Sequence, residues 1–193
     1  MSFSKFSKAV ILGSALLGSV FALSINPDGA KIDVVAFKTN AKTPVKVTFK
    51  KATFHFNKTD GSAADILKGT HVIIDLQTID ASKNPVRDKN IKTRFFAHLA
   101  NSNSAEATVT DVKGDDKSGS ITADVTFNDK KEKVTFKYEV KDGKLVATGE
   151  TDLTKNFGAK DAFETFRNDK VILGLHSKKT FSEINIGFEV PVK

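Results

Sequence analysis

The chain has 193 residues, a length that suits one domain, and its 30 Lys and Arg residues against 23 Asp and Glu residues give a formal net charge of +7. It contains no Cys, which excludes disulfides, thiolate metal sites and a Cys nucleophile. The 16 Phe residues stand against one Tyr and no Trp, so most large aromatic side chains lack a polar group and suit a strictly apolar environment.

The first 22 residues have the pattern of a secretory signal peptide. Lys5 and Lys8 supply the positive charge, residues 9–20 form the apolar segment, and Ala22 ends a small-residue cleavage site. An uncleaved membrane anchor is the alternative, but the apolar run of about 15 residues is shorter than the roughly 18 expected of a spanning helix. We therefore expect an exported protein with a cleavable signal peptide at residues 1–22. In an exported protein, basic charge favours acidic lipid head groups over nucleic acid as partners.

Most of the remaining chain alternates apolar and polar residues with a period of two, which predicts half-buried strands. The pattern covers residues 32–39, 45–49, 52–56, 70–79, 105–112, 121–127, 134–140, 145–149 and 184–190. The apolar positions change parity between Phe49 and Ala52, which predicts a bend near Lys50 and Lys51. Turn sequences such as Asp142-Gly143 predict antiparallel hairpins.

Two segments interrupt the alternation and predict short helices at residues 84–99 and 161–176, with Asp161 as the expected N-cap of the second. Eight or nine short antiparallel strands with two helices fit either a sandwich or a barrel. Small residues such as Ala123 and Ala147 lie on the same faces as the many Phe residues, which favours a barrel with room inside.

Residues 78–80 read Thr-Ile-Asp at the end of a predicted strand, and residues 87–96 read Arg-Asp-Lys-Asn-Ile-Lys-Thr-Arg-Phe-Phe. This segment resembles the YceI-like family of lipocalin-like, polyisoprenoid-binding periplasmic proteins, in which a strand ending in Ser/Thr-Ile-Asp is followed by Arg-Asp-x-x-Leu-x-Ser-x-x-Phe-Phe. This sequence has Ile91 in place of the Leu and Thr93 in place of the Ser. The order of further motifs extends the resemblance over residues 31–192.

The resemblance implies an all-β fold at residues 23–193, an antiparallel eight-stranded lipocalin-like β-barrel with one or two short helices. It also implies a periplasmic carrier for a long-chain amphiphile, either a polyisoprenoid, an isoprenoid quinone or a fatty-acid derivative, with a link to stress and with homodimer formation. No other cofactor is implied, and membrane contact would be transient. The expected lumen-lining residues are Phe49, Phe54, Phe56, Val72, Ile74, Phe95, Phe96, Phe127 and Phe136. The alternative is a dry core filled by these aromatic side chains.

Arg87 and Lys89 lie next to Phe95 and Phe96 at what the resemblance implies is the barrel mouth. We expect both cations to bind the ligand's head group, because guanidinium and ammonium groups bind phosphate and carboxylate. The alternative is a structural pair of Arg87 with Asp88 that holds the loop.

The sequence shows no enzyme signature, since it has no G-x-S-x-G motif and no phosphate-binding glycine loop. His55, His71, His98 and His176 lack metal-ligand spacing, although His55 and His71 can meet across neighbouring strands. We therefore expect neither catalysis nor a metal site. Two further functions stay open: an interaction or structural module with a filled barrel, and a hydrolase or isomerase acting on the bound lipid.

Overall fold

The computed structural model describes residues 22–193, so the predicted signal peptide lies outside the described residues apart from Ala22. Two short strands, β1 (Leu23–Ser24) and β5 (Asp60–Gly61), pair with each other. The other ten form one antiparallel sheet. In hydrogen-bonding order they are β4 (Ala52–His55), β6 (His71–Asp75), β8 (Ser104–Gly114), β9 (Ser118–Phe127), β10 (Lys130–Lys141), β11 (Lys144–Asp152), β12 (Thr180–Pro191), β2 (Lys31–Lys38), β3 (Thr43–Phe49) and β7 (Ile79–Asp80).

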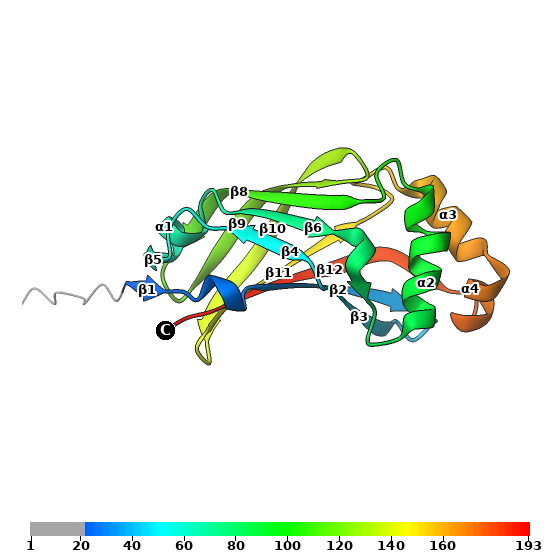
Figure 1. Cartoon of the computed structure of the whole chain (residues 1–193), viewed down its shortest axis with the longest axis horizontal. Helices are drawn as coiled ribbons and strands as arrows, with labels where there is room; N and C mark the ends of the chain where they lie inside the picture. The colour runs from blue at the N-terminus through cyan, green and yellow to red at the C-terminus, as the bar shows by residue number, and fades with distance from the viewer. Residues whose placement is uncertain (1–21) are drawn as a thin grey trace, which may run out of the picture.

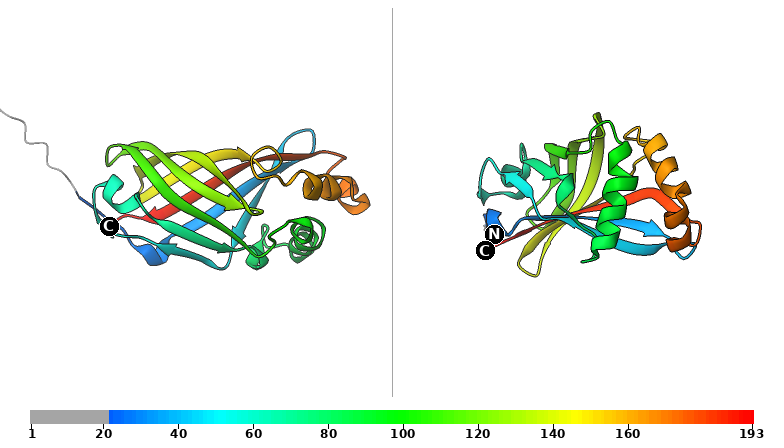
Figure 2. Two further views of the ribbon diagram at one scale, coloured as in Figure 1. Left: turned by 90° about the horizontal axis from the view of Figure 1, so that it is seen from above. Right: turned by 45° about the vertical axis from the view of Figure 1, so that its right-hand side comes forward.

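The sheet is strongly curled, as Figure 1 and Figure 2 show, and the sequence prediction of an antiparallel all-β fold is confirmed. The predicted bend at Lys50 and Lys51 is also confirmed, because β3 ends before these residues and β4 begins after them. Pairing continues through the bend: β3 pairs with β7 and β4 with β6. Between the two pairs, the amides of Lys50 and Asp75 donate hydrogen bonds to the carbonyls of Thr78 and Lys51, both at 3.0 Å.

The helices lie at the two ends of the curled sheet. Those in the described chain are η1 (Pro27–Gly29), α1 (Ala63–Leu67), η2 (Leu76–Thr78), α2 (Pro85–Arg94), η3 (Phe96–His98), α3 (Lys160–Asn168) and α4 (Lys170–Leu175). In Figure 1, α2, α3 and α4 gather at the end opposite to the C-terminus, which we call the helical end. None of these helices is long and apolar enough to cross a membrane.

The second predicted helix is interrupted, which the sequence analysis did not anticipate. Asp169 has extended backbone angles between α3 and α4, and its carboxylate accepts hydrogen bonds from the amides of Val171 and Ile172. A short polar side chain that caps the following turn ends the preceding helix. The prediction of Asp161 as N-cap is wrong, since Ala159 occupies that position and Asp161 lies in the first turn of α3.

The period-two stripes form the core as predicted. Seven inward residues of β9 and β10 are buried and Val140 is half-buried; the buried ones are Ile121, Ala123, Val125, Phe127, Val134, Phe136 and Tyr138. At the end away from α2, the short helix α1 adds Ile66 and Leu67, which are almost completely buried. The Ala63 amide donates to the Asp116 carboxylate at 2.7 Å, so α1 is fastened to the turn between β8 and β9.

Candidate functional site

The inner face of the sheet encloses a cavity of about 450 Å³. This volume lies within the range of roughly 300–1,000 Å³ that is usual for small-molecule sites. Its wall consists of apolar side chains at every second strand position, because alternate residues of a strand point to the same face. The wall includes Ile32, Val34 and Ala36 of β2, Val45, Val47 and Phe49 of β3, Ala105, Ala107 and Val109 of β8, and Ile184, Ile186 and Phe188 of β12.

Most residues that the sequence analysis assigned to the lumen line this cavity. They are Phe49, Val72, Ile74, Phe95, Phe96, Phe127 and Phe136. Phe54 and Phe56 are the exceptions among the predicted set. Their half-buried rings stack on each other, with centroids 6.2 Å apart, and both pack against Phe188. They therefore support the cavity wall through Phe188, and contact of any of these residues with a ligand stays a prediction.

Arg87 lies at the helical end of the cavity and has two roles. Its Nη1 donates a hydrogen bond to the carbonyl of Ala81 at 3.0 Å, while Asp88 accepts one from the amide of Ala81 at 2.7 Å. Both side chains therefore bind the backbone of Ala81, the buried residue that follows β7. The structural alternative had them pairing with each other instead. Arg87 also lines the cavity, and its guanidinium has five N–H donors in all.

Lys89 is placed differently from the prediction. Its side chain is exposed and lies outside the described cavity lining, whereas the half-buried Arg87 lines it. The helix geometry explains the difference, because two positions along an α-helix are separated by roughly 200° around its axis. The two cations thus point in opposite directions, and the expectation that both bind one head group is not supported for Lys89.

Two polar residues that the sequence analysis missed complete this end of the cavity. His176 lines it, and its Nδ1 lies 2.8 Å from the hydroxyl oxygen of Thr180. Burial, together with the positive charges of Lys38 and Arg87, lowers the pKa of His176 from 6.5 to about 4. The site therefore presents a neutral imidazole beside two cations. His176 ends a predicted helix. Lys38 lies near the end of the predicted strand at residues 32–39 and shares the parity of Val34 and Ala36, so strand alternation was the signal that could have found it.

An ion pair joins the helices on the two sides of this end. Arg94 at the end of α2 pairs with Asp169 at the start of α4, and its Nε donates to Asn90 Oδ1 at 3.2 Å. Asn90 also lines the cavity. The ring of Phe95 packs on Phe166 of α3, with centroids 5.8 Å apart. These contacts fix α2 against α3 and α4, and so fix the width of the cavity mouth.

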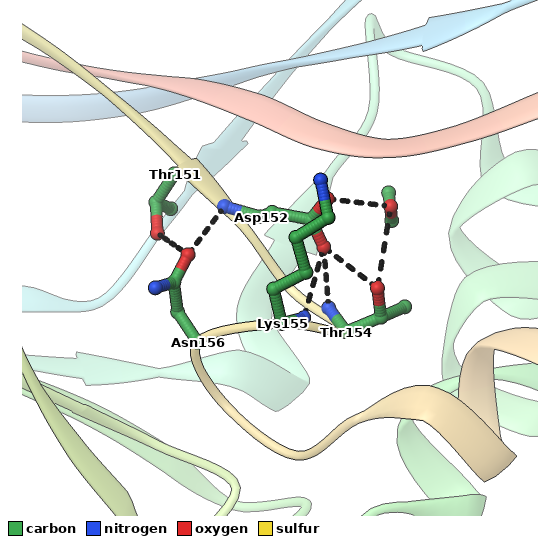
Figure 3. A network of polar contacts seen from close by, with 6 residues as sticks. Thr151, Asp152, Thr154, Lys155 and Asn156 are labelled. Atoms are coloured by element: carbon green, nitrogen blue, oxygen red, sulfur yellow. Dashed lines mark hydrogen bonds and ion pairs between the residues drawn. The ribbon is translucent and has the colours of Figure 1, made fainter.

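The segment that leads from β11 to α3 is held by one buried carboxylate (Figure 3). Asp152 accepts hydrogen bonds from the hydroxyl and amide of Thr154, the amide of Lys155 and the hydroxyl of Ser182 on β12. Burial alone would raise the pKa of Asp152, but these hydrogen bonds outweigh it and hold the pKa below its ordinary value. The carboxylate thus fixes the entry into α3, and with it one wall of the mouth.

The two histidines that the sequence analysis placed on neighbouring strands do meet. The rings of His55 and His71 stack at 6.2 Å across β4 and β6, and His71 lies 3.5 Å from Glu106. Within residues 22–193, no group of three or more His, Asp or Glu residues is arranged to hold a metal ion.

Comparison with known proteins identifies the family to which this fold belongs. A family model described as the YceI-like domain matches residues 23–191. The chain belongs to the YceI-like family. A search of curated proteins found no match.

Several solved structures share the fold at low sequence identity. A polyisoprenoid-binding domain from Saccharophagus degradans, implicated in plant cell wall breakdown, has a TM-score of 0.59 at 12% identity, over 89% of this chain and 97% of that one. BcnA from Burkholderia cenocepacia has a TM-score of 0.57 at 16% identity, over 88% and 99%. The YceI protein of Campylobacter jejuni has a TM-score of 0.53 at 18% identity, over 78% and 86%.

Proposed function

We propose that this YceI-like protein binds and carries a long-chain amphiphile, either a polyisoprenoid, an isoprenoid quinone or a fatty-acid derivative. The observation that carries the proposal is the apolar cavity of about 450 Å³ with its polar groups Arg87, His176 and Thr180 at one end. A hydrocarbon tail in the cavity would gain about 0.8 kcal/mol for each buried methylene group. An anionic or hydrogen-bonding head group would lie beside Arg87.

The strand pairing supports a barrel around this ligand. Counting β3 with β4, and β6 with β7, as two bent strands reduces the ten strands to eight. Because β3 pairs with β7 and β4 with β6, the order β2, β3–β4, β6–β7, β8, β9, β10, β11 and β12 returns to β2 and closes a ring. Barrels of eight strands can hold one small ligand in their interior.

Binding is favoured over the other functions considered above. The cavity argues against a barrel filled by its own side chains, since Phe residues line the space without occupying it. One structure of the same fold is described as a polyisoprenoid-binding domain, which supports the ligand class. The few polar lining groups at the helical end suit the binding of a head group, so we propose a carrier and not an enzyme.

The cellular setting is proposed from the sequence alone. The pattern of residues 1–22 supports export to the periplasm, where a carrier would exchange its lipid with a membrane by transient contact. Mass spectrometry of the mature protein tests the cleavage after Ala22. Size-exclusion chromatography with light scattering tests the homodimer that the family resemblance implies.

Binding is tested by titrating the purified and delipidated protein with a fluorescent fatty acid such as cis-parinaric acid. The fluorescence of the fatty acid increases when it enters an apolar cavity. Ala107→Phe places a ring in the cavity, and we expect this variant to show no increase. Thr108→Phe is the matched control, because Thr108 is the exposed neighbour on the same strand. Absence of binding by the wild-type protein, or equal binding by both variants, would refute a ligand in this cavity.

A further inference from the structure

Large apolar side chains that are exposed in the described chain gather at the helical end. Val86 on α2 is 68% exposed, and Val171 and Leu175 on α4 are 45% and 54% exposed. Val86 and Leu175 also line the cavity, so they stand on its rim. A contiguous exposed apolar patch on a soluble domain commonly marks an interaction surface.

Val86 lies in the first turn of α2, and the other two exposed apolar side chains lie on α4. On α4, Val171, Gly174 and Leu175 are exposed while Ile172 is buried, which is the spacing of one helix face. Arg87 in the first turn of α2 and His176 at the end of α4 line the same cavity. Figure 2 shows both helices at this same end of the molecule.

Basic side chains surround the apolar rim. Residues 83–94 carry five Lys and Arg residues and one acidic residue, Asp88, which is bonded to the Ala81 amide. The exposed lysines around the rim are Lys83, Lys89, Lys170, Lys178 and Lys179, and within residues 22–193 none of them forms an ion pair. Unpaired cations next to exposed apolar groups match the chemistry of an anionic lipid surface.

One aromatic ring at the rim adds to this pattern. Phe181, at the start of β12, also lines the cavity, and the ammonium groups of Lys42 and Lys179 lie over its ring at 4.9 and 5.1 Å from the centroid. The amide of Thr39 donates to the Lys179 carbonyl at 2.9 Å, which holds the loop between β2 and β3 at the same place. Cations from two further segments, Lys42 and Lys179, therefore lie beside a ring that lines the cavity.

We propose that this surface docks the protein on an anionic lipid bilayer, with the cavity mouth turned toward the membrane. The mouth face consists of Val86, Val171, Leu175, Lys89, Lys170 and Lys178. The apolar side chains enter the head-group region and the lysines bind lipid phosphates. A bilayer suits this face better than an acidic protein does, because the apolar groups continue into a cavity that accepts hydrocarbon. The purpose of docking, which is exchange of the bound lipid, rests on the proposed carrier function. Docking itself can be measured on protein whose cavity holds no ligand.

Cosedimentation with vesicles tests the charges of this face. Delipidated protein is mixed with vesicles of phosphatidylcholine alone, or of equal parts phosphatidylcholine and phosphatidylglycerol. Each basic residue near an anionic surface strengthens binding about fivefold, so Lys89→Glu, Lys170→Glu and Lys178→Glu together should weaken binding on the order of 100-fold. The control variant carries Lys68→Glu, Lys117→Glu and Lys137→Glu, which change the net charge equally at exposed positions away from the mouth face.

Selective binding to the anionic vesicles, lost in the first variant and largely kept in the control, would support the mouth face. Equal loss in both variants, or no binding by the wild type, would overturn the proposal. Binding to soluble polyglutamate without binding to vesicles would overturn it as well. The fatty-acid titration is run on the same samples, so a failure of docking and a failure of ligand binding are seen separately.

A tryptophan reporter tests which side of the molecule meets the membrane. The chain has no Trp, so a single introduced indole reports without interference. With anionic vesicles, the emission of Val171→Trp should move to shorter wavelength, because the indole enters a less polar environment. Lys137→Trp on the outer face of β10 should not respond. A shift in both variants, or in neither, would contradict docking through α4.

Discussion

At the scale of single residues, Arg87 carries the proposal for the ligand's head group. Its guanidinium lines the cavity and uses one N–H to hold Ala81, which leaves further donors for an anion. We expect Arg87→Ala to weaken binding of a fatty acid about 10- to 100-fold, the usual value of a hydrogen bond to a charged group. Binding of the corresponding fatty alcohol, which lacks the charge, should change little. Lys89→Ala is the matched control and should affect neither ligand.

His176 provides a second test at this scale through its pKa of about 4. Because the folded-state pKa lies below the ordinary value of 6.5, the unfolded chain takes up the proton first on acidification. The contribution of His176 to stability is therefore complete above pH 6.5 and is lost as the pH falls from 6.5 toward 4. Urea unfolding of the wild type should lose more stability between pH 7 and pH 4.5 than that of His176→Gln. An equal loss in both proteins would contradict a buried, neutral imidazole.

The same residue should also report on the ligand. An anionic head group beside Arg87 and Lys38 would favour the protonated imidazole, so the pKa of His176 should rise when a fatty acid binds. NMR titration of the ring protons with and without the fatty acid measures this shift. An unchanged pKa in the saturated complex would place the head group elsewhere.

At the scale of elements, Asp152 fixes the segment between β11 and α3. Removing its charge leaves Thr154, Lys155 and Ser182 with a weaker acceptor, so Asp152→Asn should lower the free energy of unfolding by about 1–3 kcal/mol. Its lowered pKa means that this stability is present above pH 3.8 and is lost as the pH falls further. Urea denaturation measures both effects. Asp142→Asn, in the exposed hairpin turn, is the control and should be close to neutral.

The elements also show what the sequence could predict. Alternation located the strands and the bend near Lys50, because the faces of a sheet impose a period of two. It did not locate α1, whose five residues span little more than one helical turn, nor the break at Asp169. Both features depend on side-chain hydrogen bonds to backbone amides, for which periodicity gives no signal.

The site was predictable in its apolar part and less so in its polar part. Seven of the nine expected lining residues line the cavity, because strand parity decides which face they share. Lys89 lies outside the described cavity lining, because two positions along a helix turn the side chain by roughly 200°, and its contact with a head group stays a prediction. His176, Thr180 and Lys38 come from three different elements, so only the assembled fold brings them together with Arg87.

At the scale of the whole molecule, the two ends of the curled sheet differ. The end near α1 is filled by Ile66 and Leu67, which are almost fully buried, while the helical end carries Arg87, His176 and the mouth face. A bound amphiphile should therefore have one orientation, with its tail toward α1 and its head beside Arg87. Docking through the mouth face would then bring the head-group end toward the bilayer.

Native mass spectrometry of the protein purified from its own host can detect a hydrocarbon tail held in the cavity. We expect an added mass on the chain that organic extraction removes and that fragments as a long-chain amphiphile. A protein that carries no extractable molecule, and takes up no fatty acid when it is supplied, would refute the proposed ligand.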